Sequence, residues 1–271
     1  ENNLPYGGHG KSIPGTPEQF SDEWWDFFSF AAKECEKYDM SIGMGDYTIA
    51  WIGNGYFTDK LSAMPDMHAK NMSIEKKMLF SGDEEGLSDD VLVALYYKDI
   101  ACEEPVIIYE KDKGICSPIP GICEAYIVSV HETDKSIDPL NPGYGKILTE
   151  IYFEEFFRRV PDVKEGVLNY FFQDELMFGT DIKTIWGESL RNGIREKYGY
   201  DVIGFLPHLF YNLGDITPKV RLDVSDIRTL LTEENYFKPI YEFHASKNLI
   251  YGCDQSSRGK EPDEFSDYFR T

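Results

Sequence analysis

Two adjacent acids, Asp174 and Glu175, directly follow an aromatic run and are the residues of this chain best suited to catalysis. The run from Leu168 to Phe172 is apolar or aromatic at nearly every position, which is typical of a strand buried on both faces of a parallel sheet. Two carboxyl groups that share a small volume interact strongly, so we expect one to be protonated near neutral pH. A protonated carboxyl beside an ionised one suits acid/base hydrolysis. The alternative is structural: Asp174 caps the next helix or loop, and Glu175 pairs with a nearby base.

Two more predicted strands also end in acids. Met40–Asp46 resembles a short strand with close-approach glycines, and Leu249–Asp254 is the last strand that we expect. Helical patterns alternate with these strands, and the carboxyl ends of parallel strands open into the ligand crevice of α/β folds. The pattern therefore predicts a (β/α) barrel of the TIM type, with all of these acids at one end.

The predicted helices have recognisable start and stop signals. Ser21 is suited to cap a helix whose first turn holds Asp22 and Glu23. Its apolar face consists of residues at helical spacing, namely Trp24, Phe28, Ala31, Cys35 and Tyr38. Helical periodicity returns at residues 146–159, 181–198 and 224–246, and Gly199 is placed to end the second of these helices.

Residues 72–122 differ in character from the rest of the chain, because short strand-like runs alternate there with acidic or Gly/Pro turns. We predict a small β-rich insertion at 72–122, peripheral to catalysis, between barrel segments at 1–71 and 123–271. The run at 125–131 is expected to rejoin the barrel. With 41–46, 167–174 and 249–254 it makes four barrel strands, and a complete barrel has eight. We therefore expect an incomplete barrel, inactive by itself, with the second catalytic carboxylate beyond Thr271.

Composition limits the classes of partner. The 271 residues are 42% hydrophobic and 15% aromatic, enough for a substantial core, and the net charge is −21. Such acidity disfavours nucleic acid and anionic membranes as partners, and no apolar run reaches transmembrane length. Five cysteines without a C-x-x-C pair and five histidines without a zinc motif indicate no metal centre or other cofactor. Calcium held by carboxylate oxygens remains open.

Two loops contribute candidate binding residues. Trp51 lies in a Gly-rich loop after a strand end, where an aromatic ring suits the flat face of a sugar; packing of the loop onto its own scaffold is the alternative. The segment Gly7–Ser12 resembles a phosphate loop, but Pro5 stands where that pattern requires glycine and no strand precedes it. We expect this loop to place His9 at a pocket rim instead.

Five stretches together resemble the catalytic barrel of large bacterial glycoside hydrolases, nearest to the α-L-rhamnosidase-like family 106 and its relatives. They are Glu23-Trp-Trp-Asp26, Gly43-Met-Gly-Asp46, Phe171-Phe-Gln-Asp-Glu175, Lys197-Tyr-Gly-Tyr-Asp201 and the segment from Arg258 to Arg270. The resemblance implies a TIM-barrel glycosidase, secreted or periplasmic in polysaccharide-degrading bacteria and sometimes calcium-dependent. Glu175 would match its catalytic acid. Asp174 and Glu175 are adjacent here, whereas that family spaces an Asp and a Glu further apart, which puts rhamnose specificity in question.

We therefore interpret the chain as part of a hydrolase that cleaves glycosidic bonds in plant or host polysaccharides, with Glu175 as the acid. Adjacent strand residues point to opposite faces, so Asp174 is expected to orient or bind the sugar. The predicted substrate-binding set is Asp174, Asp46, Asp254, Trp51, His9 and Arg258. The rival functions are a non-catalytic carbohydrate-binding protein on a barrel scaffold and a metal-dependent hydrolase that uses the acids as ligands.

Overall fold

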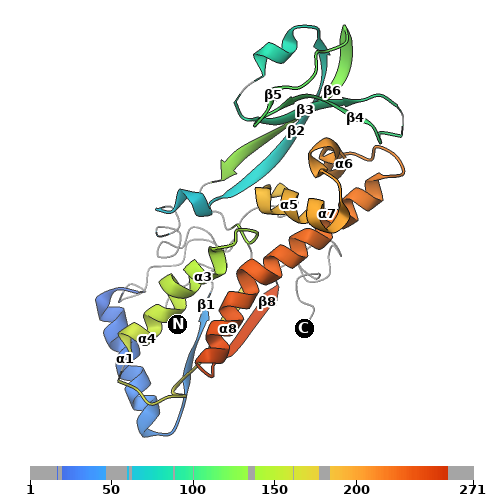
Figure 1. Cartoon of the computed structure of the whole chain (residues 1–271). Coiled ribbons are helices and arrows are strands. Elements are labelled where there is room, and N and C mark those ends of the chain that lie inside the picture. The colour runs from blue at the N-terminus through green and yellow to red at the C-terminus, as the bar shows by residue number, and fades with distance from the viewer. Residues whose placement is uncertain are drawn as a thin grey trace. The chain divides into compact units, whose positions relative to one another are not determined.

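The structure is a computed structural model that describes residues 17, 20–46, 60, 63–87, 89–99, 101–133, 138–160, 162–176 and 184–255 (Figure 1). The side chains of residues 46, 65, 133, 173–176, 254 and 255 lie outside this description. The chain divides into two compact units. Unit 1 comprises residues 1–68, 134–180 and 232–271, and unit 2 comprises residues 69–133 and 181–231.

Unit 1 is built around a three-stranded parallel sheet with the order β1–β7–β8. Its strands are β1 (Ile42–Asp46), β7 (Leu168–Leu176) and β8 (Ile250–Gln255). Three of the predicted barrel strands are thus confirmed as neighbours in one parallel sheet. β1 and β8 form its edges, and the described residues do not close a complete barrel. The fold is mixed α/β, with one parallel and one antiparallel sheet.

Helices cover one face of the parallel sheet (Figure 1). They are α3 (Tyr144–Leu148), the π-helix η3 (Thr149–Phe153), α4 (Glu154–Arg159), the π-helix η6 (Glu233–Phe237) and α8 (Lys238–Ser246). The ring of Phe171 in β7 is buried on this face, with centroid distances of 5.1 Å to Phe153, 5.0 Å to Phe156 and 5.6 Å to His244. Tyr170, the preceding strand residue, is exposed, so the described elements leave the opposite face partly open.

Helix α1 (Asp22–Lys37) begins as predicted, because the Ser21 side chain accepts a hydrogen bond from the Trp24 N–H at 3.2 Å. Its buried face comprises Trp24, Trp25, Phe28 and Ala32. The Trp25 ring lies 4.9 Å from that of Phe156, which fixes the helix to α4. The predicted apolar face is wrong at its end, because Tyr38 follows the helix as its C-cap and is exposed.

Unit 2 contains a five-stranded antiparallel sheet with the order β2–β6–β3–β4–β5. The strands are β2 (Ala69–Phe80), β3 (Val91–Tyr97), β4 (Pro105–Glu110), β5 (Gly114–Ile115) and β6 (Ile122–Thr133). Two short 3₁₀ helices, η1 (Pro65–Met67) and η2 (Asp83–Gly86), precede and follow β2. The predicted insertion at 72–122 lies within this region, and its predicted boundaries fall inside β2 and at the start of β6.

The prediction that residues 125–131 rejoin the barrel is wrong, because they form the middle of β6 and pair with β2 and β3. Ala125 and Ile127 belong to the core cluster on one face of this sheet. Tyr126 points to the other face, where its ring lies 5.8 Å from Tyr97 and 5.7 Å from Tyr211. A strand buried on both faces has the same continuous apolar pattern in either kind of sheet, which explains the error.

Four helices complete unit 2: α5 (Glu188–Tyr198), η5 (Val202–Phe205), α6 (Pro207–Phe210) and α7 (Thr217–Thr232). Gly199 ends α5 in the left-handed conformation with φ 76°, which confirms the predicted C-cap. The Tyr97 hydroxyl donates to the Gly204 carbonyl at 3.0 Å, and a Cβ on Gly204 would lie 2.7 Å from the Pro105 ring. The helical layer therefore sits close against β3 and β4.

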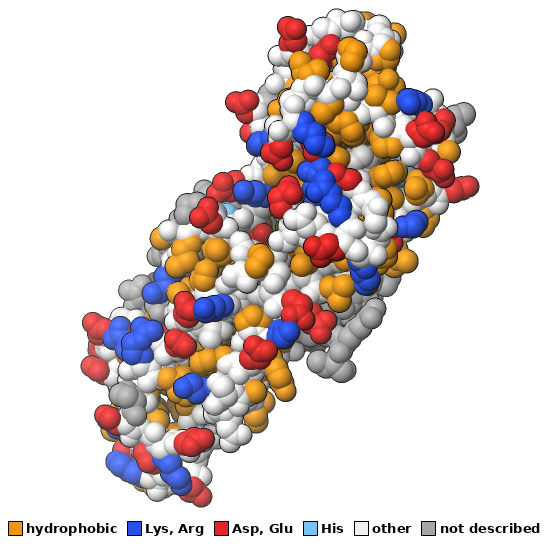
Figure 2. All heavy atoms as spheres, in the orientation of Figure 1, with side chains coloured by type: hydrophobic (Ala, Val, Ile, Leu, Met, Phe, Trp, Pro, Cys, Tyr) orange, Lys and Arg blue, Asp and Glu red, His pale blue; other side chains and the backbone are white. Residues whose placement is uncertain are grey.

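Acidic and basic side chains are interspersed on the visible surface, and hydrophobic side chains gather on the visible face of unit 2 (Figure 2). Among the described helices, none combines the length and the apolar character that a bilayer crossing requires.

Candidate functional site

The backbone brings four candidate acids to the carboxyl-terminal edge of the parallel sheet. β1 ends at Asp46, whose partner on β7 is Gln173. On the other side of β7, Gln173 pairs with Cys253 of β8, and Leu176 pairs with Gln255. Neighbouring strands lie about 4.8 Å apart. The ends of β1, β7 and β8, with Asp46, Asp174, Glu175 and Asp254, are therefore side by side.

A β-bulge lies at the predicted catalytic acids. Between its two paired positions with β8, β7 has two residues, Asp174 and Glu175, where β8 has only one, Asp254. Bulges bend a strand, redirect its side chains and recur next to active sites. Alternation of side chains between the two faces, which would separate Asp174 from Glu175, requires a regular strand. It does not hold at this bulge, so either acid is a candidate for the reacting group.

Glycines on both neighbouring strands allow the aromatic residues of β7 to lie across them. A Cβ on Gly43 of β1 would lie 2.1 Å from the Tyr170 ring, and a Cβ on Gly252 of β8 would lie 2.5 Å from the Phe172 ring. Gly43 is the register partner of Tyr170, and Gly252 is that of Phe172. The close-approach glycines expected in β1 are thus confirmed for Gly43, and they help to hold the three strand ends together.

The helix-covered face of the parallel sheet packs an uncharged histidine against the strands. His244 of α8 is fully buried, and its ring lies 4.9 Å from that of Tyr251 in β8. Its Nδ1 is 2.7 Å from the Ile240 carbonyl oxygen. Burial lowers the pKa of His244, whereas burial raises the pKa of Tyr251, so both side chains are uncharged at neutral pH. His244 therefore packs against β7 and β8 as an uncharged side chain.

The remaining predicted site residues stay predictions. Trp51, His9 and Arg258 lie outside the described residues, and the side-chain positions of the four acids are likewise not described. Within the described part of the chain, no group of three or more His, Cys, Asp or Glu residues is arranged to hold a metal ion. The bulge was not predicted, although two adjacent acids at a strand end were a signal for it.

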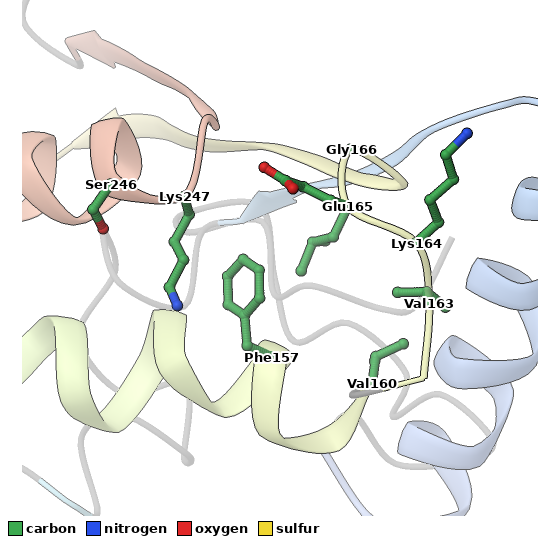
Figure 3. Close-up of a pocket in the computed structure, with 9 residues that line it drawn as sticks. Phe157, Val160, Val163, Lys164, Glu165, Gly166, Ser246 and Lys247 are labelled. Carbon is green, nitrogen blue, oxygen red and sulfur yellow. The ribbon is translucent and has the colours of Figure 1, made fainter.

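A cavity of about 270 Å³ lies at the opposite end of the parallel sheet (Figure 3). Its walls include Phe157, Leu168 at the start of β7, and Lys247 between α8 and β8. The Lys247 ammonium lies 5.5 Å from the Phe157 ring centroid. The volume is below the roughly 300–1,000 Å³ typical of ligand pockets. Because it lies at the amino ends of the strands, this cavity is not the predicted site.

No protein-family model and no curated protein matches this sequence. The structure is similar to that of a rhamnosidase from Novosphingobium sp. PP1Y, with a TM-score of 0.56 and 10% sequence identity. The similarity covers 88% of this chain and 41% of the rhamnosidase chain, so this chain spans about two fifths of that protein's length. At such low identity the likeness concerns the fold alone. The two chains therefore share a fold over the matched residues.

Proposed function

We propose that this chain contributes to a barrel glycosidase that cleaves glycosidic bonds of oligo- or polysaccharides by carboxylate acid/base catalysis. The observation that carries the proposal is the bulge that sets Asp174 and Glu175 opposite Asp254 at the carboxyl ends of parallel strands. The fold likeness to a rhamnosidase supports the same class of reaction. The proposal includes that the enzyme belongs to family 106 or a relative, and that further strands complete the barrel.

In the proposed mechanism, Glu175 protonates the leaving oxygen and a second carboxylate acts as nucleophile or base. Retaining glycosidases hold the two carboxyl groups about 5–5.5 Å apart, and inverting ones about 6.5–9.5 Å. Asp254 stands opposite the bulge on the neighbouring strand, and this proposal assigns it the shorter separation. Asp46 pairs with Gln173, two residues before Glu175, so their backbone positions are roughly 8 Å apart. Asp254 as the partner predicts retention of the anomeric configuration, and Asp46 predicts inversion.

The other predicted residues have supporting roles in this proposal. Trp51 would stack on a sugar ring, while His9 and Arg258 would hydrogen-bond to sugar hydroxyls. We also propose that the acids can bind calcium and that the protein is secreted or periplasmic. Loss of activity on chelation, with recovery on adding calcium, would support the metal.

The test is a screen of the full chain, alone and within any longer polypeptide that contains it, against aryl glycosides and oligosaccharides. Glu175→Gln should lower the hydrolysis rate about 10²–10⁴-fold, because a general acid contributes that much. Glu165→Gln is the matched control, since Glu165 is exposed in the turn at the other end of β7 and should leave the rate unchanged. NMR of the first-formed anomer then separates Asp254 from Asp46 as the partner.

Activity of Glu175→Gln within a few-fold of the wild type would remove Glu175 from the mechanism. Binding of a glycan without hydrolysis of any substrate would instead favour the carbohydrate-binding protein. Far-UV circular dichroism of each variant keeps a folding defect from being mistaken for a catalytic one.

A further inference from the structure

Helix α1 has a second apolar row that faces away from the core of unit 1. Phe27 is 59% exposed and Phe30 is 62% exposed, and Tyr38 and Met40, which follow the helix, are exposed as well. Phe27 and Phe30 are three residues apart and share a helix face. Tyr38 follows Phe27 by eleven residues, or about three turns, and Glu34, which pairs with Lys37, lies between Phe30 and Tyr38 on the same face. We call Phe27, Phe30 and Tyr38 the outer row.

The outer row is not needed to attach α1 to the core, because the opposite side of the helix already makes those contacts. The rings of Trp24, Trp25 and Phe28 lie between 4.9 and 6.3 Å from that of Phe156. Exposed single apolar residues are ordinary on protein surfaces, but aligned aromatic residues on one helix face are typical of an interface.

The charges around the outer row restrict its partner. Glu23 lies one turn before Phe27, Asp26 lies one turn before Phe30, and both carboxylates are exposed without an ion pair among the described residues. The lysines of α1 are already engaged, Lys33 with Asp162 and Lys37 with Glu34. The amino-terminal end of the outer row is therefore acidic. A partner with positive charges beside its apolar residues would complement it.

We infer that the outer row of α1 docks an amphipathic helix of a partner protein, with apolar residues in one row and Lys or Arg on its flanks. A helix fits because a straight row of side chains at helical spacing interdigitates with a second row of the same kind. A second copy of this chain is disfavoured, since each copy has a net charge of −21 and would bring the same acids together.

The test uses the full chain and a fluorescein-labelled 18-residue helical peptide with leucines at positions i, i+4, i+7 and i+11 and lysines on the flanks. Fluorescence anisotropy should give a Kd below about 100 µM at low salt, weakening as salt rises. Phe27→Ser and Phe30→Ser should each weaken binding at least about tenfold, because hot-spot aromatic residues carry most of an interface's affinity. Glu23→Lys with Asp26→Lys should also weaken it. Tyr241→Ser, at an equally exposed aromatic on α8, should have no effect.

A second peptide, with the same leucines and glutamates on its flanks, tests the charge argument and should bind at least tenfold more weakly. Equal binding of both peptides, or binding that ignores Phe27→Ser and Phe30→Ser, would overturn the inference. Concentration-dependent dimerisation in sedimentation, abolished by Phe27→Ser, would assign the face to a second copy and overturn it too. Circular dichroism of each variant confirms that α1 is still folded.

Discussion

Arg191 connects three elements of unit 2, and its replacement provides a quantitative test of how that unit is held together. Its guanidinium donates to Glu110 Oε1 of β4 at 2.7 Å. It also donates to Asp201 Oδ1 at 2.9 Å and Oδ2 at 2.7 Å. Asp201 in turn caps η5 by accepting from the Ile203 N–H at 3.2 Å. The side chains of Arg191 and Glu110 are only 5% and 4% exposed, so water screens this pair little.

Arg191→Met should destabilise unit 2 by about 3–5 kcal/mol, because removing one partner of a buried pair leaves an uncompensated charge. Glu110 would then keep only Lys113, which is itself well exposed. Arg195 binds the same Asp201 but is 42% exposed, so Arg195→Met should cost less than about 1 kcal/mol. Adding Glu110→Leu to Arg191→Met should recover part of the loss, since it removes the stranded carboxylate.

The assay is urea unfolding followed by circular dichroism, with hydrogen exchange measured on peptides that cover β4 and α5. Hydrogen exchange assigns the loss to unit 2, because two units need not unfold as one. An Arg191→Met variant that loses no more stability than Arg195→Met would refute the reasoning. So would a double variant less stable than Arg191→Met alone.

Three further predictions concern Asp201 in unit 2, and His244 and Gly145 in unit 1. Burial of Asp201 favours its protonated form, but hydrogen bonds from Arg191, Arg195 and the Ile203 N–H outweigh this and lower its pKa to about 2. The ionised Asp201 should therefore stabilise the fold above about pH 4, and this stabilisation should be lost as the pH falls through 2. Acid unfolding of Asp201→Asn should show no such loss over that pH range. Burial lowers the pKa of His244, so stability should fall as the pH drops through the unfolded-state value of about 6.5, and His244→Leu should reduce this slope in urea titrations. Gly145→Ala should cost about 1–3 kcal/mol, because its Cβ would meet the Tyr236 carbonyl oxygen at 2.5 Å, whereas Gly187→Ala, with open space around it, should be near neutral by thermal unfolding.

The elements of unit 1 were predictable from local signals, although β7 is buried on one face and not on both, since Tyr170 is exposed. Ser21, followed by two acids, defines the start of α1, and the short apolar runs around residues 42, 171 and 251 are strands that each lead to an acid. That these strands are neighbours was expected because the carboxyl ends of parallel strands meet at one edge of a sheet, and no single residue indicated it. The bulge at Asp174 and Glu175 depends on how β7 and β8 pair, and no local pattern encodes a register between strands 80 residues apart in sequence, as Phe172 and Gly252 are.

The motif Lys197-Tyr-Gly-Tyr-Asp201 shows how a resemblance can rest on structure rather than chemistry. The Tyr198 hydroxyl donates to Asp226 Oδ2 at 2.7 Å, Gly199 ends α5, and Asp201 holds Arg191. All three residues act in the packing of unit 2. The role of this motif in packing could not be predicted from the sequence, because the partners Glu110 and Asp226 lie in other elements.

The interleaving of the two units has a consequence for synthesis of the chain. Gly45 of β1 pairs with Phe172 of β7, so about 125 residues must be made before β1 gains its neighbour. At roughly 5–20 residues per second, the ribosome takes about 6–25 s over that stretch, during which β1 lacks its β7 neighbour. The sequence of β1, Ile-Gly-Met-Gly-Asp, contains only two large apolar residues. Such a strand is a poor seed for aggregation, so its two glycines protect the nascent chain, and Gly43 also admits the Tyr170 ring of β7.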